Sequence, residues 1–87
     1  MGFEWDEEKS KKTKEDRGIS FEDAMVLWLD REALDIPARS EGETRWARIG
    51  KIHEKIFIAF FTNRAGKIRV ISVRRARIKE EALYVKE

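Results

Sequence analysis

The sequence contains no cysteine, one histidine and one proline. Without cysteine the chain forms neither a disulfide framework nor a thiolate metal site, and a lone histidine argues against a histidine-based metal site. We therefore expect no metal and no cofactor. The longest apolar runs, at 24–29 and 56–61, have six residues each, far fewer than the roughly 20 residues that span a bilayer. The acidic first residues do not resemble a secretion signal, so we expect a cytoplasmic protein without a membrane partner.

Charge is abundant and unevenly distributed along the chain. Charged residues make up 41% of the sequence and the net charge is +2, whereas an average protein has about 25% charged residues. The segment 62–79 carries seven basic residues and no acidic one. Such a segment is typical of a surface that binds a polyanion, but a solvated ionic surface would give the same composition. Both interpretations stay open at this point.

The order of predicted elements indicates a single α+β domain over residues 1–87. Short connections between the later strands favour antiparallel pairing. We therefore expect a twisted antiparallel sheet of about four strands, with the helices segregated on one face. The predicted elements are a short strand at 3–5, helices at 6–17 and 20–29, strands at 34–36, 45–52, 56–61 and 67–75, and a closing helix at 77–85.

The two N-terminal helices have different characters. The helix at 6–17, capped by Asp6 and ended by Gly18, has no apolar side chain. We expect opposite charges four residues apart to support it, and expect it to be the least stable element. The second helix, capped by Ser20, has apolar residues at helical spacing. The buried stripe predicted from this spacing consists of Phe21, Ala24, Met25, Trp28 and Leu29.

The last predicted strand begins as an apolar strand and ends in arginines. Regular alternation would place Arg69 and Arg75 on one face of the sheet and Arg74 on the other. Only one of the two adjacent arginines would then face a given groove. The sequence does not tell which face is open.

Four local motifs occur in one order along the chain. Together they resemble the BrnT family of toxins from bacterial type II toxin–antitoxin modules, over about residues 3–79. The resemblance implies a RelE-like fold, in which two N-terminal helices pack on a twisted antiparallel sheet and a short C-terminal helix follows. The motifs are FEWDEEK at 3–9, GISFEDA at 18–24, GETRWARIG at 42–50 and IRVISVRRA at 68–76.

The resemblance also implies a function and partners. A family member would be a ribonuclease that inhibits translation, neutralised by a BrnA-like antitoxin with a ribbon-helix-helix domain. Operator DNA would be contacted only through that antitoxin. Two positions depart from the family pattern: Thr13 stands where many members have Asn, and Arg17 stands where many have His. A catalytic role of that His would be missing here.

Cutting RNA without a metal requires groups that move protons from the ribose 2′-hydroxyl and to the leaving oxygen, and cations that stabilise the charge on phosphorus. Arginine suits the last task because its planar fork holds two phosphate oxygens. We predict that Lys9, Arg45, Arg74 and Arg75 are catalytic. We predict that Trp5, Arg64, Lys67, Arg69 and Arg77 bind RNA.

Several of these residues have plainer interpretations. Lys9 matches the family motif, but an ordinary exposed helix lysine is as good an interpretation. Trp5 and Trp46 could stack on bases or pack in the core. His53 is expected in a solvated turn, and Glu43 is expected to pair with a neighbouring cation. The alternative function is a basic module that binds RNA or an antitoxin without catalysis.

Overall fold

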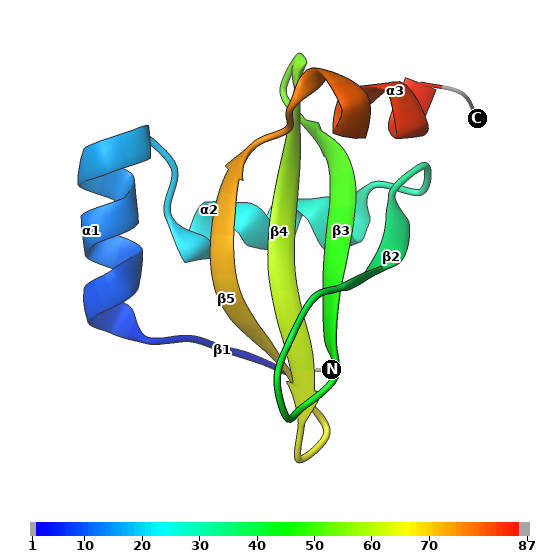
Figure 1. The fold of residues 1–87 in the computed structure, drawn as a ribbon. Coiled ribbons are helices and arrows are strands. Elements are labelled where there is room, and N and C mark those ends of the chain that lie inside the picture. The colour runs from blue at the N-terminus through cyan, green and yellow to red at the C-terminus, as the bar shows by residue number, and fades with distance from the viewer. Residues whose placement is uncertain (1, 86–87) are drawn as a thin grey trace.

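A mixed five-stranded sheet forms the centre of the protein in the computed structural model, which describes residues 2–85 (Figure 1). The strand order is β1-β5-β4-β3-β2; β1 runs parallel to β5, and the other neighbours are antiparallel. The elements are β1 (Gly2–Glu4), α1 (Glu7–Arg17), α2 (Phe21–Ala24), the 3₁₀ helix η1 (Met25–Leu29), β2 (Leu34–Ala38), β3 (Arg45–Ile52), β4 (Lys55–Arg64), β5 (Lys67–Arg75) and α3 (Ile78–Val85).

The α+β class is confirmed, but the expected all-antiparallel sheet of about four strands is wrong. The fifth strand is β1, which pairs with β5 through Gly2, Phe3 and Glu4. Local periodicity does not reveal this pairing because β1 is only three residues long and its partner lies near the other end of the sequence. In the described part of the chain, no helix is both long and apolar enough to cross a membrane.

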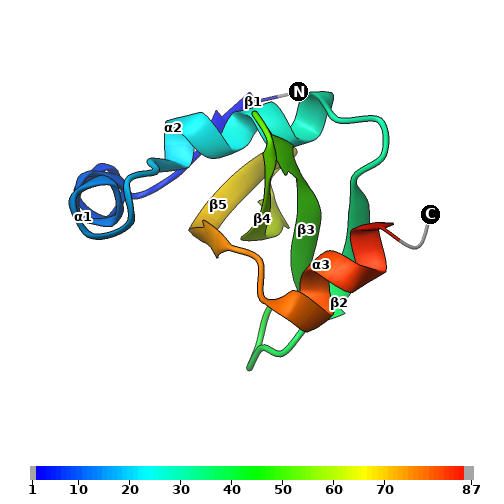
Figure 2. The ribbon, with the colours of Figure 1, turned by 90° about the horizontal axis from the view of Figure 1, so that it is seen from above.

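Helices cover both faces of the sheet, contrary to the expectation of one covered face. Figures 1 and 2 show α2 and η1 across one face, α3 across the upper part of the other, and α1 beside the edge of β5. We call these the α2 face and the α3 face. The expectation that both N-terminal helices pack on the sheet is therefore wrong for α1. Without apolar residues, α1 has nothing to bury against a sheet face.

The central strand β4 contributes to two apolar clusters, one on each face. Ala59 belongs to the cluster under α2, together with Val70 and Val73 of β5. Ile56 and Ile58 belong to the cluster on the α3 face. This confirms the prediction that the apolar segment 56–61 is a central strand covered on both sides.

The second helix changes from α to 3₁₀ after Ala24. A 3₁₀ helix has three residues per turn, so residues three apart lie above one another. Phe21, Ala24 and Leu27 follow that spacing and are buried, whereas Leu29 is 81% exposed. The predicted stripe, which assumed a continuous α-helix, was therefore wrong for Leu29 and omitted Leu27.

The predicted ends of the two N-terminal helices are confirmed. Asp6 caps α1 by accepting hydrogen bonds from backbone amides of its first turn. Gly18 ends α1 with φ of 79°, a conformation that favours glycine. Ser20 and Asp23 form a reciprocal capping box at the start of α2, with hydrogen bonds of 3.0 and 2.9 Å.

Few of the charge pairs expected within α1 form. Among the described residues, the only intrahelical ion pair joins Lys12 to Asp16 at 3.7 Å. Polar contacts to other elements hold the helix instead. Lys14 donates to Asp23 of α2 at 2.9 Å, and Arg17 donates to the carbonyl of Val73 in β5 at 2.9 Å.

A β-bulge interrupts β5 at Ile71. Val70 pairs with Phe61 and Ser72 pairs with Phe60, so Ile71 has no partner on β4. The extra residue reverses the alternation of side chains along the rest of the strand. Val70 and Val73 therefore share the α2 face, although they are three residues apart.

Candidate functional site

The bulge also determines which arginines share a face. Arg69 and Arg74 both lie on the α3 face, and Arg75 lies on the α2 face, where its guanidinium is 5.7 Å from the ring of Phe57. The predicted grouping of Arg69 with Arg75 is therefore wrong. Regular alternation fails here because one residue of β5 is not matched on β4.

A depression of about 110 Å³ lies where the start of α1, β5 and the segment before β3 meet. Arg45 reaches it from the first residue of β3, two residues before Ala47 of the apolar cluster on the α3 face. Lys9 reaches it from the first turn of α1. The six charged residues of its lining are Asp6, Lys9, Glu43, Arg45, Arg64 and Arg69.

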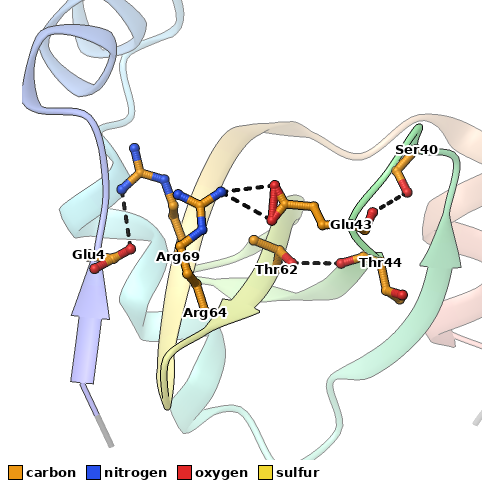
Figure 3. A network of polar contacts seen from close by, with 7 residues as sticks. All are labelled: Glu4, Ser40, Glu43, Thr44, Thr62, Arg64 and Arg69. Atoms are coloured by element: carbon orange, nitrogen blue, oxygen red, sulfur yellow. Dashed lines mark hydrogen bonds and ion pairs between the residues drawn. The ribbon is translucent and has the colours of Figure 1, made fainter.

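The segment before β3 is fixed by short hydrogen bonds. The buried hydroxyl of Thr62 in β4 donates to the carbonyl of Thr44 at 2.6 Å, and Ser40 donates to the carbonyl of Glu43 at 2.6 Å (Figure 3). Thr62 is paired with Arg69 across the strands. The sheet therefore positions both this segment and the arginine that faces it.

Two of the four cations around the depression are neutralised by carboxylates. Arg64 donates to both carboxylate oxygens of Glu43, at 2.9 and 3.1 Å. Arg69 donates to Glu4 of β1 at 3.3 Å, across the parallel pair that the sequence did not reveal. Figure 3 shows the two arginines side by side, with one carboxylate on either side. The expected pairing of Glu43 with a cation is confirmed.

Lys9 and Arg45 are the cations of the depression without such a partner. Neither forms an ion pair within residues 2–85. The Nε of Arg45 is buried and has no hydrogen-bond partner among the described residues. A buried donor without an acceptor is costly, so this guanidinium has hydrogen-bonding capacity that the described residues do not use. These two side chains therefore have unused capacity for a phosphate group.

Arg74 does not join the other predicted catalytic residues. It lies five residues beyond Arg69 on the same face, roughly 15 Å along a strand. Its guanidinium binds both carboxylate oxygens of Glu80 in α3, each at 2.8 Å, and lies 5.4 Å from the ring of Phe60. The structure thus commits Arg74 to holding α3, and it places Arg75 on the opposite face.

The remaining predicted RNA-binding residues are dispersed. Lys67 is exposed beside the turn into β5, on the α3 face with Arg64 and Arg69. Arg77 is exposed between β5 and α3. Trp5 is half-buried and packs against the cluster under α2, in agreement with its plainer interpretation.

A larger apolar cleft of about 460 Å³ lies on the α2 face, at the opposite end of the sheet from the depression. It is lined by Ile19, Val26 and Phe57, and by His53 at the tip of the β3–β4 turn. His53 is exposed and has φ of 58°, as expected for a residue in a solvated turn. Besides His53, two bases and two acids line this cleft, so it has no excess of positive charge.

Sequence reasoning missed two acidic residues of the site. Asp6 was assigned only as a helix cap, but its cap position also brings it into the depression. Glu4 was not singled out, because its contact with Arg69 depends on the parallel β1–β5 pairing. The motif FEWDEEK gave the only signal for both. Among the described residues, no group of three or more His, Asp or Glu side chains could hold a metal ion.

Comparison with known proteins supports one family. The family model described as "Ribonuclease toxin, BrnT, of type II toxin-antitoxin system" matches residues 5–80, which include all six charged residues of the depression. No curated protein matches the sequence. A match over most of the chain shows the family, in agreement with the resemblance of the four motifs. The chain belongs to the BrnT family of ribonuclease toxins of type II toxin–antitoxin systems.

Proposed function

We propose that this toxin cleaves RNA without a metal ion, in the depression that holds Lys9 and Arg45. The observation that carries the proposal is that these two cations face one depression without carboxylate partners. Unpaired cations fixed on rigid elements can bind a phosphate and stabilise the charge that develops on it. Arg74 and Arg75, which lie elsewhere, are left out of this active site.

In the proposed mechanism Arg45 holds the scissile phosphate. Its guanidinium fork donates two hydrogen bonds to the non-bridging oxygens. The ribose 2′ oxygen bonds to phosphorus while the bond to the 5′ oxygen breaks. The products are a 2′,3′-cyclic phosphate and a free 5′-hydroxyl, so one proton must leave the 2′ oxygen and one must reach the 5′ oxygen.

We assign these two proton transfers to Asp6 and Lys9. The Oδ1 atom of Asp6 caps α1, whereas no hydrogen bond engages its Oδ2 among the described residues, so Oδ2 can accept the 2′-hydroxyl proton. The ammonium group of Lys9, three residues later on α1, donates a proton to the leaving oxygen. Lys67, exposed on the α3 face, binds a neighbouring phosphate, and Arg64 and Arg69 join it when RNA phosphates replace Glu43 and Glu4 as their partners.

Substitutions of the three assigned residues test the mechanism. Asn caps a helix as well as Asp does, so Asp6→Asn should fold normally and lose proton acceptance alone. Lys9→Met and Arg45→Ala remove the cations. Each variant should slow single-turnover cleavage about 100-fold or more, the usual effect of removing a group that stabilises the transition state. Arg31→Ala, which removes an exposed cation elsewhere, is the matched control and should cleave normally.

The outcomes separate catalysis from binding. RNA affinity of the Asp6→Asn variant should stay within a few-fold of the parent affinity, while cleavage falls. Cleavage should persist in excess chelator. Wild-type rates for Asp6→Asn or Lys9→Met would disprove the assigned roles, and loss of cleavage in chelator would disprove metal independence.

A non-catalytic module remains the second candidate, because of the position where many family members have His. Arg17 occupies it and uses its guanidinium to hold the carbonyl of Val73, so the residue acts in attaching α1 to the sheet. A chain that binds RNA tightly but does not cleave it at high protein concentration would support this candidate.

We further propose that the fold is a RelE-like one and that the toxin acts in the cytoplasm. Its antitoxin would be BrnA-like, with a ribbon-helix-helix domain through which the complex contacts operator DNA. Support comes from the family match, since a type II module contains a protein antitoxin. Co-purification of the toxin with the neighbouring gene product, and operator binding only in the presence of that product, would test the assignment.

A further inference from the structure

The apolar side of α3 faces outward. Ile78 is 85% exposed and Val85 70%, and Leu83, on the flank of the helix about 140° from Ile78, is 42% exposed. Amphipathic helices at a protein surface normally bury the apolar side. The sequence predicted a closing helix at 77–85, and the structure turns Ile78 and Val85 of this helix to solvent.

Polar contacts fix α3 in this orientation. Glu80 binds Arg74 through two hydrogen bonds of 2.8 Å, and Tyr84 donates to Oδ2 of Asp30 at 2.8 Å. Glu80 and Tyr84 are four residues apart and therefore lie on the same side of the helix. Rolling the apolar side inward would break both contacts and leave Arg74 half-buried without its carboxylate. The contacts of Glu80 and Tyr84 thus stabilise the orientation in which the apolar side of α3 faces solvent.

The surface around the start of α3 is positive. Arg77 and Lys79 are exposed there, and neither forms an ion pair within residues 2–85. Of the two acids in the first turn of α3, Glu80 is paired with Arg74, so only Glu81 offsets these two cations. A partner suited to this surface therefore combines apolar side chains with acidic ones.

We propose that the outward side of α3 is a docking surface for an amphipathic, acidic segment of the antitoxin. The inference rests on membership of a type II toxin family, which implies a protein partner. RNA fits this surface less well, because aliphatic side chains offer no charge or hydrogen bond to its phosphates. A second copy of this chain would bring the basic starts of two α3 surfaces into one interface, where like charges repel.

The position of α3 explains how docking there can block the active site. A stable interface buries about 800 Å² on each partner, more than an eight-residue helix offers. The α3 face of β5 leads from Arg74, at α3, to Arg69, at the depression. A segment that continues along this face from α3 would therefore cover Lys9 and Arg45.

Single substitutions with matched controls test this docking surface. The affinity of each variant for the full-length antitoxin of the same module is measured. Ile78→Asp places an acid in the first turn of α3, where a helix tolerates it well. Leu83→Asp is compared with Val26→Asp, since Leu83 and Val26 are 42% and 43% exposed but Val26 lies on the α2 face. Ile78→Asp and Leu83→Asp should weaken antitoxin binding at least about 10-fold, as loss of an interface anchor does.

The Val26→Asp control and RNA cleavage by all three variants should be unchanged. Lys79→Glu should weaken antitoxin binding and reduce its dependence on salt. Antitoxin binding by Ile78→Asp and Leu83→Asp within two-fold of the parent would overturn the proposal. So would a loss of RNA affinity or of self-association in these variants without loss of antitoxin binding. Wild-type cleavage rates for the Lys9 and Arg45 variants would disprove the cleavage mechanism. They would not affect the conclusion drawn from antitoxin binding by the α3 variants.

Discussion

The hydroxyl of Ser10 accepts a hydrogen bond of 2.9 Å from the backbone amide of Phe21. Ser10 is the buried residue of α1, and Phe21 is the first residue of α2. The first amides of a helix have no partner within that helix. One helix therefore satisfies an amide of the next, and this contact helps to replace the apolar packing that α1 lacks.

Ser10→Ala should destabilise the fold by about 1–3 kcal/mol, because it leaves the buried amide of Phe21 without an acceptor. Chemical denaturation at neutral pH measures the change. Lys11→Ala, on the exposed side of the same helix, is the control and should change stability by less than about 0.5 kcal/mol. Equal effects of the two substitutions would show that the hydrogen bond does not contribute to attaching α1.

The attachment of α3 should depend on the charge of Glu80. Hydrogen bonds from Arg74 hold the pKa of this carboxyl below its usual 4.5, and an amide hydrogen bond from Arg77 acts in the same direction. A depressed pKa in the folded state means that the stabilisation is complete above pH 4.5 and is lost as pH falls through the folded value.

Glu80→Gln should therefore cost about 1–3 kcal/mol at neutral pH. The difference between this variant and the parent should shrink below pH 4.5 and disappear in stronger acid. Urea unfolding across the acid range measures it. Glu81→Gln, at the next position, is the control, since no ion pair of Glu81 occurs in the described part of the chain. A penalty that does not change with pH would exclude a role of the carboxylate charge.

Tyr84 reports on the other attachment of α3. Burial, and then the hydrogen bond to Asp30, raise the pKa of its phenol to about 12 from the usual 10.0. It is the only tyrosine of the chain, so a titration followed by tyrosinate absorbance is unambiguous. The midpoint should lie near 12 in the folded protein and near 10 in urea. Asp30→Asn should lower the folded value part of the way, because burial remains.

The sign of this shift sets the alkaline limit of stability. A raised pKa in the folded state means that the unfolded chain loses its proton first. Stability should therefore fall as pH rises from 10 towards 12, and the Tyr84→Phe variant should lack that slope. A folded midpoint near 10.0 would show that the phenol is free and that α3 is not held at this point.

Glu43 limits the positive charge of the candidate active site through its contact with Arg64. Glu43→Gln removes one negative charge and weakens the hold on Arg64. RNA affinity should rise a few-fold at low salt, by about 1 kcal/mol or less for partly exposed charges, and its salt dependence should become steeper. Filter binding over a range of salt concentrations measures both. Glu41→Gln, in the same segment but outside the depression, should have a smaller effect.

Local signals in the sequence predicted local features well. Asp6, Gly18 and Ser20 end or begin helices through contacts within a few residues, so their roles could be assigned from the sequence. Motif resemblance placed Lys9 and Arg45 in the site, although they are far apart in the chain. Both line the same depression, in agreement with that grouping.

Features that depend on distant pairing escaped prediction. The contact of Glu4 with Arg69 requires a parallel strand pair between the two ends of the chain. The ion pair between Arg74 and Glu80 depends on how α3 folds back over the sheet. The grouping of Arg69 with Arg74 requires the bulge, which has no reliable signal in the sequence of one strand.

Deletions test the bulge directly. Removing Ile71 would let Ser72 follow Val70 without a gap, so the pairs with Phe60 and Phe61 and the faces of all later residues would be kept. Only the half-buried side chain and the local twist would be lost. The Ile71 deletion should therefore still unfold cooperatively, at a cost of about 1–2 kcal/mol.

Removing Val73 is the matched deletion with the opposite expectation. If the bulge persists, Arg74 takes the position opposite Ala59, inside the cluster under α2, where Val73 is fully buried. A charge buried there without a partner costs several kcal/mol, so this deletion should abolish cooperative unfolding. If both deletion variants fold equally well, β5 can pair with β4 in more than one register. The bulge would then not be what fixes the position of Arg69 at the depression.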